Sequence, residues 1–125
     1  MSPAVLNLTN PPSSLTRLPA STPGRATIFA AISPAEQADF LPAALGEEVR
    51  SLAEVFTVFD PTARTTDTFH QALFSANPEI LIAAWKTPAL PAVLPPRLRY
   101  VCYLCGSVKK LVTHKHLEEG LIVTN

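Results

Sequence analysis

Five short apolar runs recur along residues 26–125, and segments with helical spacing separate most of them. The runs occupy residues 26–32, 56–59, 79–84, 99–104 and 121–124. Continuous apolar runs of this length are typical of parallel strands buried on both faces. Strands that alternate with helices favour an α/β sheet, and right-handed crossovers make 2-1-3-4-5 the simplest strand order. We therefore predict a flavodoxin-like five-stranded parallel sheet with helices on both faces.

Two short helices are predicted after the first strand. Ser33–Glu36 has the residues of a capping box, with proline at the first helical position. Pro42 cannot continue that helix, so we place it in the first turn of a second one. Leu45, Val49 and Leu52 then recur at helical spacing.

Further start and stop signals mark three more helices. They are a helix capped by Thr65 or Thr66 and ended by Asn77-Pro78, a short helix near residues 91–94, and a last helix capped by Thr113 and ended by Gly120. The residues predicted for the core of the sheet are Ile28, Phe29, Ile80, Leu81, Ile82, Val101, Leu104 and Val123.

Residues 1–25 differ in composition from the rest. They hold Pro3, Pro11, Pro12, Pro19 and Pro23 among Ser, Thr and Asn, without a periodic apolar pattern. Such a composition predicts an extended arm. The folded domain is therefore predicted to span residues 26–125.

Composition limits the classes of function. A chain of 125 residues is long enough for one domain with a core of its own. Its 10 basic and 10 acidic residues leave no net charge, which argues against nucleic acid or an anionic membrane as a partner. No apolar run is long enough to span a bilayer, and no signal peptide is recognised. Two cysteines favour a reduced, cytoplasmic setting.

Gly106-Ser107-Val108 follows the fourth predicted strand and is the first candidate for ligand binding. Glycine there lets the backbone turn tightly and present N–H groups at the carboxyl end of the strand, where open α/β sheets bind ligands. Trp85-Lys86-Thr87 leaves the neighbouring strand at the same edge. A lone Trp after a strand is more often part of the core than of a ligand-binding wall.

Cys102, Cys105 and the histidines suggest no site. Their spacing fits neither a zinc finger nor a thioredoxin-like dithiol at the start of a helix. We predict Cys102 as a buried core residue and place Cys105 at the mouth of the strand, beside the cleft. His114 and His116 are predicted as solvated helix positions. No catalytic residue and no metal ligand is assigned.

The region from Glu79 onward, above all the run from Arg97 to Val108 and the ending Val123-Thr124-Asn125, resembles the substrate-binding domain of the D-isomer-specific 2-hydroxyacid dehydrogenases. The resemblance implies the same flavodoxin-like fold. It also implies that the backbone N–H groups of Gly106, Ser107 and Val108 hold the substrate carboxylate. Lys86 and Thr87 would line the cleft. Several members have glycine at the position of Lys86, so its side chain is either an anion contact or a solvated charge, with the solvated charge favoured.

The resemblance implies NAD(P)-dependent hydride transfer between a 2-hydroxy acid and its 2-keto acid in the complete enzyme. This chain has no G-x-G-x-x-G motif, and the family's nucleotide domain and catalytic Arg, Glu and His would follow Asn125. We therefore expect the chain to end before that domain, to bind no NAD or NADP and to be inactive alone. It would self-associate through apolar surface that the missing parts leave uncovered.

Two alternatives from other classes remain open. One is a stand-alone flavodoxin-like binding module. A receiver-type module is disfavoured because Ser33 and Trp85-Lys86 stand where acidic residues are expected. The other is a self-associating interaction domain, which only the oligomeric state distinguishes.

Overall fold

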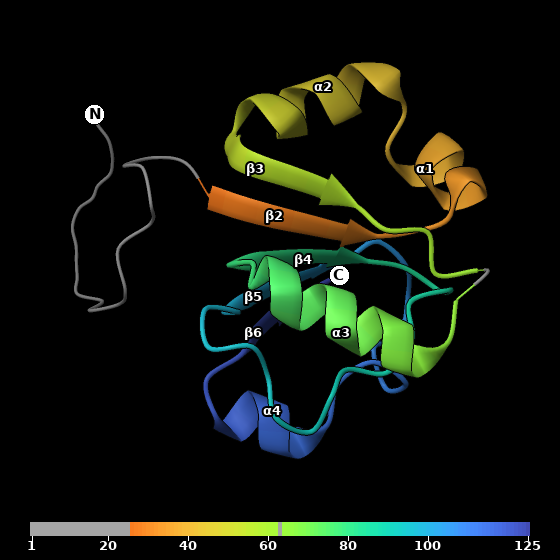
Figure 1. Cartoon of the computed structure of the whole chain (residues 1–125). Coiled ribbons are helices and arrows are strands. Elements are labelled where there is room, and N and C mark those ends of the chain that lie inside the picture. The colour runs from red at the N-terminus through yellow and green to blue at the C-terminus, as the bar shows by residue number, and fades with distance from the viewer. Residues whose placement is uncertain (1–25, 63) are drawn as a thin grey trace.

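The computed structural model describes residues 26–62 and 64–125 and has the flavodoxin-like α/β fold (Figure 1). The predicted arm at residues 1–25 lies outside the described residues. Five parallel strands pair in the order β3-β2-β4-β5-β6, which confirms the predicted order 2-1-3-4-5. The strands are β2 (Ala26–Ala31), β3 (Ala53–Val58), β4 (Ile80–Ala83), β5 (Tyr100–Tyr103) and β6 (Ile122–Thr124).

Three helices begin at predicted caps, and the helix after Pro42 begins at Ala43, with Pro42 as its N-cap rather than in its first turn. The helices are α1 (Pro34–Phe40), α2 (Ala43–Ser51), α3 (Thr66–Ala76) and α4 (His114–Glu118). Ser33 and Glu36 form the capping box of α1, while Thr65 caps α3 and Thr113 caps α4. Asn77 ends α3 in the left-handed conformation, with φ 45°. Each cap satisfies a backbone N–H that the first turn of a helix leaves without a partner, so these short polar residues fix where the helices start.

Side chains that point to opposite faces of the sheet form two separate hydrophobic cores. On one face, Phe29 packs against Phe59 and Phe69, with ring centroids 5.8 and 6.5 Å from that of Phe29. On the other face, Ile28 and Ile82 belong to a cluster that α2 helps to cover. Helices α1 and α2 lie on one side of the sheet, and α3 and α4 lie on the other (Figure 1). The layers thus follow from the alternation of side chains along buried strands.

Most of the predicted core residues are buried. Those buried are Ile28, Phe29, Leu81, Ile82 and Val101. Ile80, Leu104 and Val123 are only partly buried and pack against the two cores from their margins. The predicted core is therefore confirmed at the centre of the sheet and is weaker toward β6.

One predicted helix is wrong, and the predicted bounds of one strand are shifted. Residues 91–94 form no helix, because this proline-rich connection is tied to other segments: the Leu90 N–H donates to the carbonyl of Leu111, and the Pro91 carbonyl accepts from His116. Strand β3 begins at Ala53 rather than Phe56, and Phe59 lies beyond its end. As an edge strand, β3 exposes Glu54 and Val55, and Glu54 breaks the apolar run that would mark a fully buried strand.

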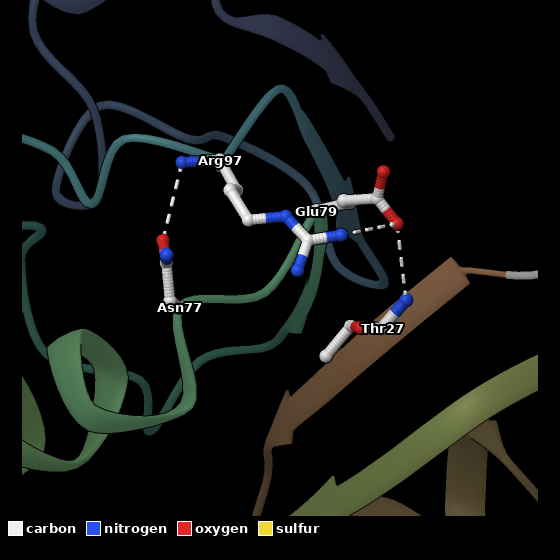
Figure 2. Close-up of polar contacts among 4 residues, drawn as sticks. All are labelled: Thr27, Asn77, Glu79 and Arg97. Atoms are coloured by element: carbon white, nitrogen blue, oxygen red, sulfur yellow. Dashed lines mark hydrogen bonds and ion pairs between the residues drawn. The ribbon is translucent and has the colours of Figure 1, made fainter. Parts of the chain in front are cut away.

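Glu79 joins three strands at the amino edge of the sheet. Figure 2 shows its side-chain contacts with Thr27 and Arg97. The Glu79 N–H donates to the carbonyl of Thr27, and its Oε1 accepts from the Thr27 N–H at 3.2 Å. Its carbonyl accepts from the N–H groups of Arg99 and Tyr100. The Arg97 guanidinium lies 3.5 Å from the same carboxylate, and Asn77 Oδ1 accepts from the Arg97 N–H. Hydrogen bonds and an ion pair within the protein therefore occupy the polar groups of Glu79 at the amino edge of the sheet. We expect a functional site among the loops at the opposite, carboxyl edge.

Gly46 provides a test of the helical structure of α2. It lies inside the helix with an ordinary backbone conformation, and an added Cβ would come no closer than 3.7 Å to the Leu41 carbonyl oxygen. Gly46→Ala should therefore raise the free energy of unfolding by about 0.5–1 kcal/mol, because alanine loses less backbone entropy on folding. Urea denaturation measures this change. Gly120→Ala, at φ 103°, should do the opposite; equal effects of the two variants would contradict the assignment of α2.

Candidate functional site

The candidate site lies where the chain leaves the carboxyl ends of β2, β4 and β5. From β2 the chain passes outward to β3, and it then returns to β4 on the other side of β2. This reversal makes the β2/β4 boundary the topological switch point, the usual place for ligands in open α/β sheets. The loops that meet there begin at Ile32, Ala84 and Leu104.

Glu36 ties two of these loops together. Its side chain is buried, with 5% of the residue exposed. Oε1 accepts the Ser33 N–H at 3.0 Å, and Oε2 accepts the Lys86 N–H at 2.9 Å. One carboxylate thus completes the helix cap and also holds the loop after β4. The sequence indicates the first role through the capping box, but no local signal indicates the second.

Lys86 and Thr87, both predicted to line a substrate cleft, have different surroundings. The Lys86 residue is exposed while its N–H is used by Glu36. Thr87 is buried, and its hydroxyl donates to the Ala31 carbonyl at 2.6 Å and accepts the Ala84 N–H at 2.9 Å. The Thr87 hydroxyl therefore bridges β2 and β4, so its evident role is to position this loop.

The turn Gly106–Val108 has free hydrogen-bond donors. Gly106 and Ser107 are exposed, and within the described part of the chain the N–H groups of Gly106, Ser107 and Val108 have no hydrogen-bond acceptor. Ser107 Oγ instead accepts the Lys109 N–H at 3.3 Å, and the Val108 carbonyl accepts from Leu111 and Val112. The turn is thus held by contacts that leave its first three amides available to an anion.

Gly106 borders open space. A Cβ built on it would meet no atom within 4 Å, and its backbone lies outside the left-handed region. The conformation alone therefore does not require glycine here. What the absent side chain provides is room for a ligand to approach the backbone.

Trp85 and Cys105 flank this turn. Trp85 is 60% exposed rather than part of the core, and its ring meets that of Phe40 edge-on at 5.5 Å. Burial raises the pKa of the Cys105 thiol, while a hydrogen bond from the Trp85 backbone N–H lowers it and the Glu36 carboxylate raises it. Burial also raises the pKa of Cys102, which is partly buried as part of the core margin. Neither thiol has the electropositive surroundings that favour a thiolate nucleophile.

The prediction that His116 is solvated is wrong. The residue is 1% exposed: its Nδ1 accepts the Thr113 N–H at 3.1 Å, and its Nε2 lies 2.8 Å from the carbonyl oxygen of Pro91 and donates to it. His116 thus replaces the usual acidic residue in the capping box of α4 and anchors the connection that was predicted to be helical. His114 is exposed, as predicted.

Metal and dinucleotide chemistry find no support in these loops. Among the described residues, no three His, Cys, Asp or Glu side chains are placed to hold a metal ion. The first turn after β2 lacks glycine, and the N–H groups of Ser33 and Glu36 are taken up by the capping box, so this turn does not offer them to a dinucleotide phosphate. Within residues 26–62 and 64–125, no helix has the length and apolar character needed to cross a membrane.

Replacing Glu36 tests its bridging role. Glu36→Ala leaves the N–H groups of Ser33 and Lys86 without their acceptor, so we expect a loss of about 2–3 kcal/mol in the free energy of unfolding. Hydrogen exchange at the Lys86 amide should accelerate in the same variant. Glu48→Ala, on the exposed surface of α2, serves as the control and should change stability by less than about 0.5 kcal/mol. Equal effects of the two substitutions would refute the bridge.

Comparisons with family models, with curated proteins and with solved structures found no match to this chain. The dehydrogenase resemblance therefore stays a prediction from the residues.

Proposed function

We propose that the turn Gly106–Val108 binds the carboxylate of a small 2-hydroxy or 2-keto acid, as in the substrate-binding domain of a D-2-hydroxyacid dehydrogenase-like oxidoreductase. The observation that carries this proposal is that three backbone N–H groups at the carboxyl edge of the sheet have no hydrogen-bond acceptor among the described residues. The open space above Gly106 and the exposed ring of Trp85 support it.

Backbone amides suit this task in a chain without net charge. They bind an anion through fixed dipoles, and no permanent charge has to be buried in the empty state. The exposed residues Lys109 and Lys110 follow the turn and add a favourable field at its rim. Glu36 opposes an incoming anion, but its two oxygens already accept two N–H groups. Lys86 is exposed on the adjacent loop and adds a further positive charge to this edge.

The proposed contribution of this chain to the reaction is orientation of the substrate. In a dehydrogenase of the resembled family, NAD or NADP would serve as the cofactor, and the complete enzyme would supply that site and the catalytic acid or base. We assign no hydride-transfer step and no catalytic residue to the described residues. We propose a cytoplasmic setting, which the two free cysteines support.

Titration with pyruvate tests the carboxylate site. In ¹⁵N-labelled protein, the amide signals of Gly106, Ser107 and Val108 should shift saturably with pyruvate and should not respond to the neutral analogue pyruvamide. Gly106→Val should weaken pyruvate binding about tenfold, because a branched side chain blocks approach to the backbone, with little change in stability. Gly46→Ala, remote from the turn, is the matched control. Unchanged affinity in Gly106→Val would remove this turn from the site.

Self-association is a second proposed function, and one surface favours it. On the face that α2 helps to cover over β2 and β3, the side chains of Tyr100, Cys102 and Leu104 are only partly buried. Ile122, paired with Tyr100 on the neighbouring strand β6, is 55% exposed. A second copy of the chain placed there would bury this apolar surface, and a molecule without net charge opposes such contact little.

Light scattering over a range of concentrations measures the oligomeric state. We expect a dimer or larger assembly, and Ile122→Lys should shift it toward the monomer, because a buried unpaired charge is costly at an interface. Leu52→Lys changes another exposed apolar residue, at the end of α2, and should leave the assembly intact. A wild-type protein that stays monomeric at high micromolar concentration would eliminate this function.

A further inference from the structure

A cavity of about 190 Å³ lies between the two helices α1 and α2 and the carboxyl halves of β2 and β3. Apolar atoms of Ala30, Leu41 and Phe56 contribute to its wall, and Gly46, Glu47 and Arg50 of α2 complete it. A cavity of about 150 Å³ can hold a benzene-sized group, so this one has room for a single side chain, and polar atoms form more of its exposed lining than apolar atoms do. It is lined by none of the residues of the Gly106 turn.

The glycine in this wall has no other structural explanation. Gly46 lies inside α2, where glycine costs about 0.5–1 kcal/mol relative to alanine. Its backbone conformation is available to any residue, and an added Cβ would make only an ordinary contact with the Leu41 carbonyl oxygen at 3.7 Å. A side chain at this position would occupy part of the cavity wall. Gly46 therefore keeps space that the fold itself does not need.

Opposite charges stand side by side at the rim of the cavity. Glu47 and Arg50 are three residues apart on α2, so they lie on neighbouring positions of one helix face. The Arg50 guanidinium sits 4.7 Å from the centre of the Phe56 ring, which holds it over the cavity wall. Among the described residues, no oppositely charged group lies within 4 Å of the Glu47 carboxylate or the Arg50 guanidinium. The ion pair found among these residues joins Glu79 and Arg97. The rim thus offers one cationic and one anionic side chain from adjacent turns of the same helix.

We infer that this cavity binds a free α-amino acid with an apolar side chain. The ammonium and carboxylate groups of such a molecule are attached to one carbon atom, so a single zwitterion can contact Glu47 and Arg50 together. Its side chain would pack against Leu41 and Phe56, which line the cavity and are partly exposed, and would remove their apolar surface from water. The amide of Gln37, which also lines the cavity, supplies a further donor and acceptor. This site is independent of the proposed carboxylate turn.

The experiment compares L-leucine with two analogues that each lack one charge. In ¹⁵N-labelled protein, leucine should shift the amide signals of Ala30, Gly46, Glu47 and Arg50 saturably. 4-Methylpentanoate lacks the ammonium group and 3-methylbutylamine lacks the carboxylate, so both should bind at least about fivefold more weakly. If either analogue binds as well as leucine, or if leucine causes no saturable shift up to its solubility limit, the inference is wrong.

Charge variants assign the two contacts. Arg50→Gln should weaken leucine binding about fivefold and leave the affinity for 3-methylbutylamine unchanged, because the amine does not use the guanidinium. Glu47→Gln should weaken leucine to a similar extent and spare 4-methylpentanoate. Glu48→Gln removes an adjacent carboxylate that does not line the cavity and should have no effect. Equal loss in Glu48→Gln and Glu47→Gln would show a general charge effect and overturn the assignment. The Gly106–Val108 amides should not respond to leucine at concentrations that saturate the cavity, so failure here leaves the carboxylate proposal intact.

Discussion

The Glu36 carboxylate is the interaction on which the arrangement of the candidate site depends. The loops after β2 and β4 diverge at the switch point, and the hydrogen bonds from Ser33 and Lys86 to one buried side chain hold them together. A buried carboxylate is stable only when hydrogen-bond donors contact its oxygens. The Lys86 N–H is one of the donors to Glu36, so this hydrogen bond fixes the orientation of the Lys86 backbone. With Thr87 joined to Ala31 and Ala84, the loop after β4 becomes a fixed wall beside the turn after β5.

The two edges of the sheet are therefore unlike in their hydrogen bonding. At the amino edge, Glu79 uses its N–H, its carbonyl and its carboxylate to join β2, β4 and β5, and Arg97 pairs with its charge. At the carboxyl edge, Glu36 and Thr87 satisfy the loops of β2 and β4, whereas the Gly106–Val108 amides have no described acceptor. Because unsatisfied donors are tolerated only where water or a ligand can reach them, the exposed position of this turn suits reversible binding.

Local sequence signals predicted much of this fold. The caps at Ser33, Thr65 and Thr113 and the apolar runs of the central strands depend on neighbours in sequence, so the helix starts and the strand order were predicted correctly. The second contact of Glu36, the buried ring of His116 and the exposed ring of Trp85 depend on segments distant in sequence, and no spacing rule indicates them. The same limit explains the false helix at residues 91–94, which His116 and Leu111 hold in an extended path.

Both proposed small-molecule sites lie at the periphery of the α/β sheet and have exposed charged side chains at their rims. The turn after β5 offers backbone dipoles, and the α2 rim offers Glu47 and Arg50, whose charges cancel. Neither arrangement requires a buried permanent charge in the empty state, which would carry a large desolvation cost in a domain of this size. Shape adds to the selectivity that the turn amides, Glu47 and Arg50 provide, through the room above Gly106 at one site and beside Gly46 at the other. Two glycines whose backbone conformations do not require glycine thus border the two proposed sites.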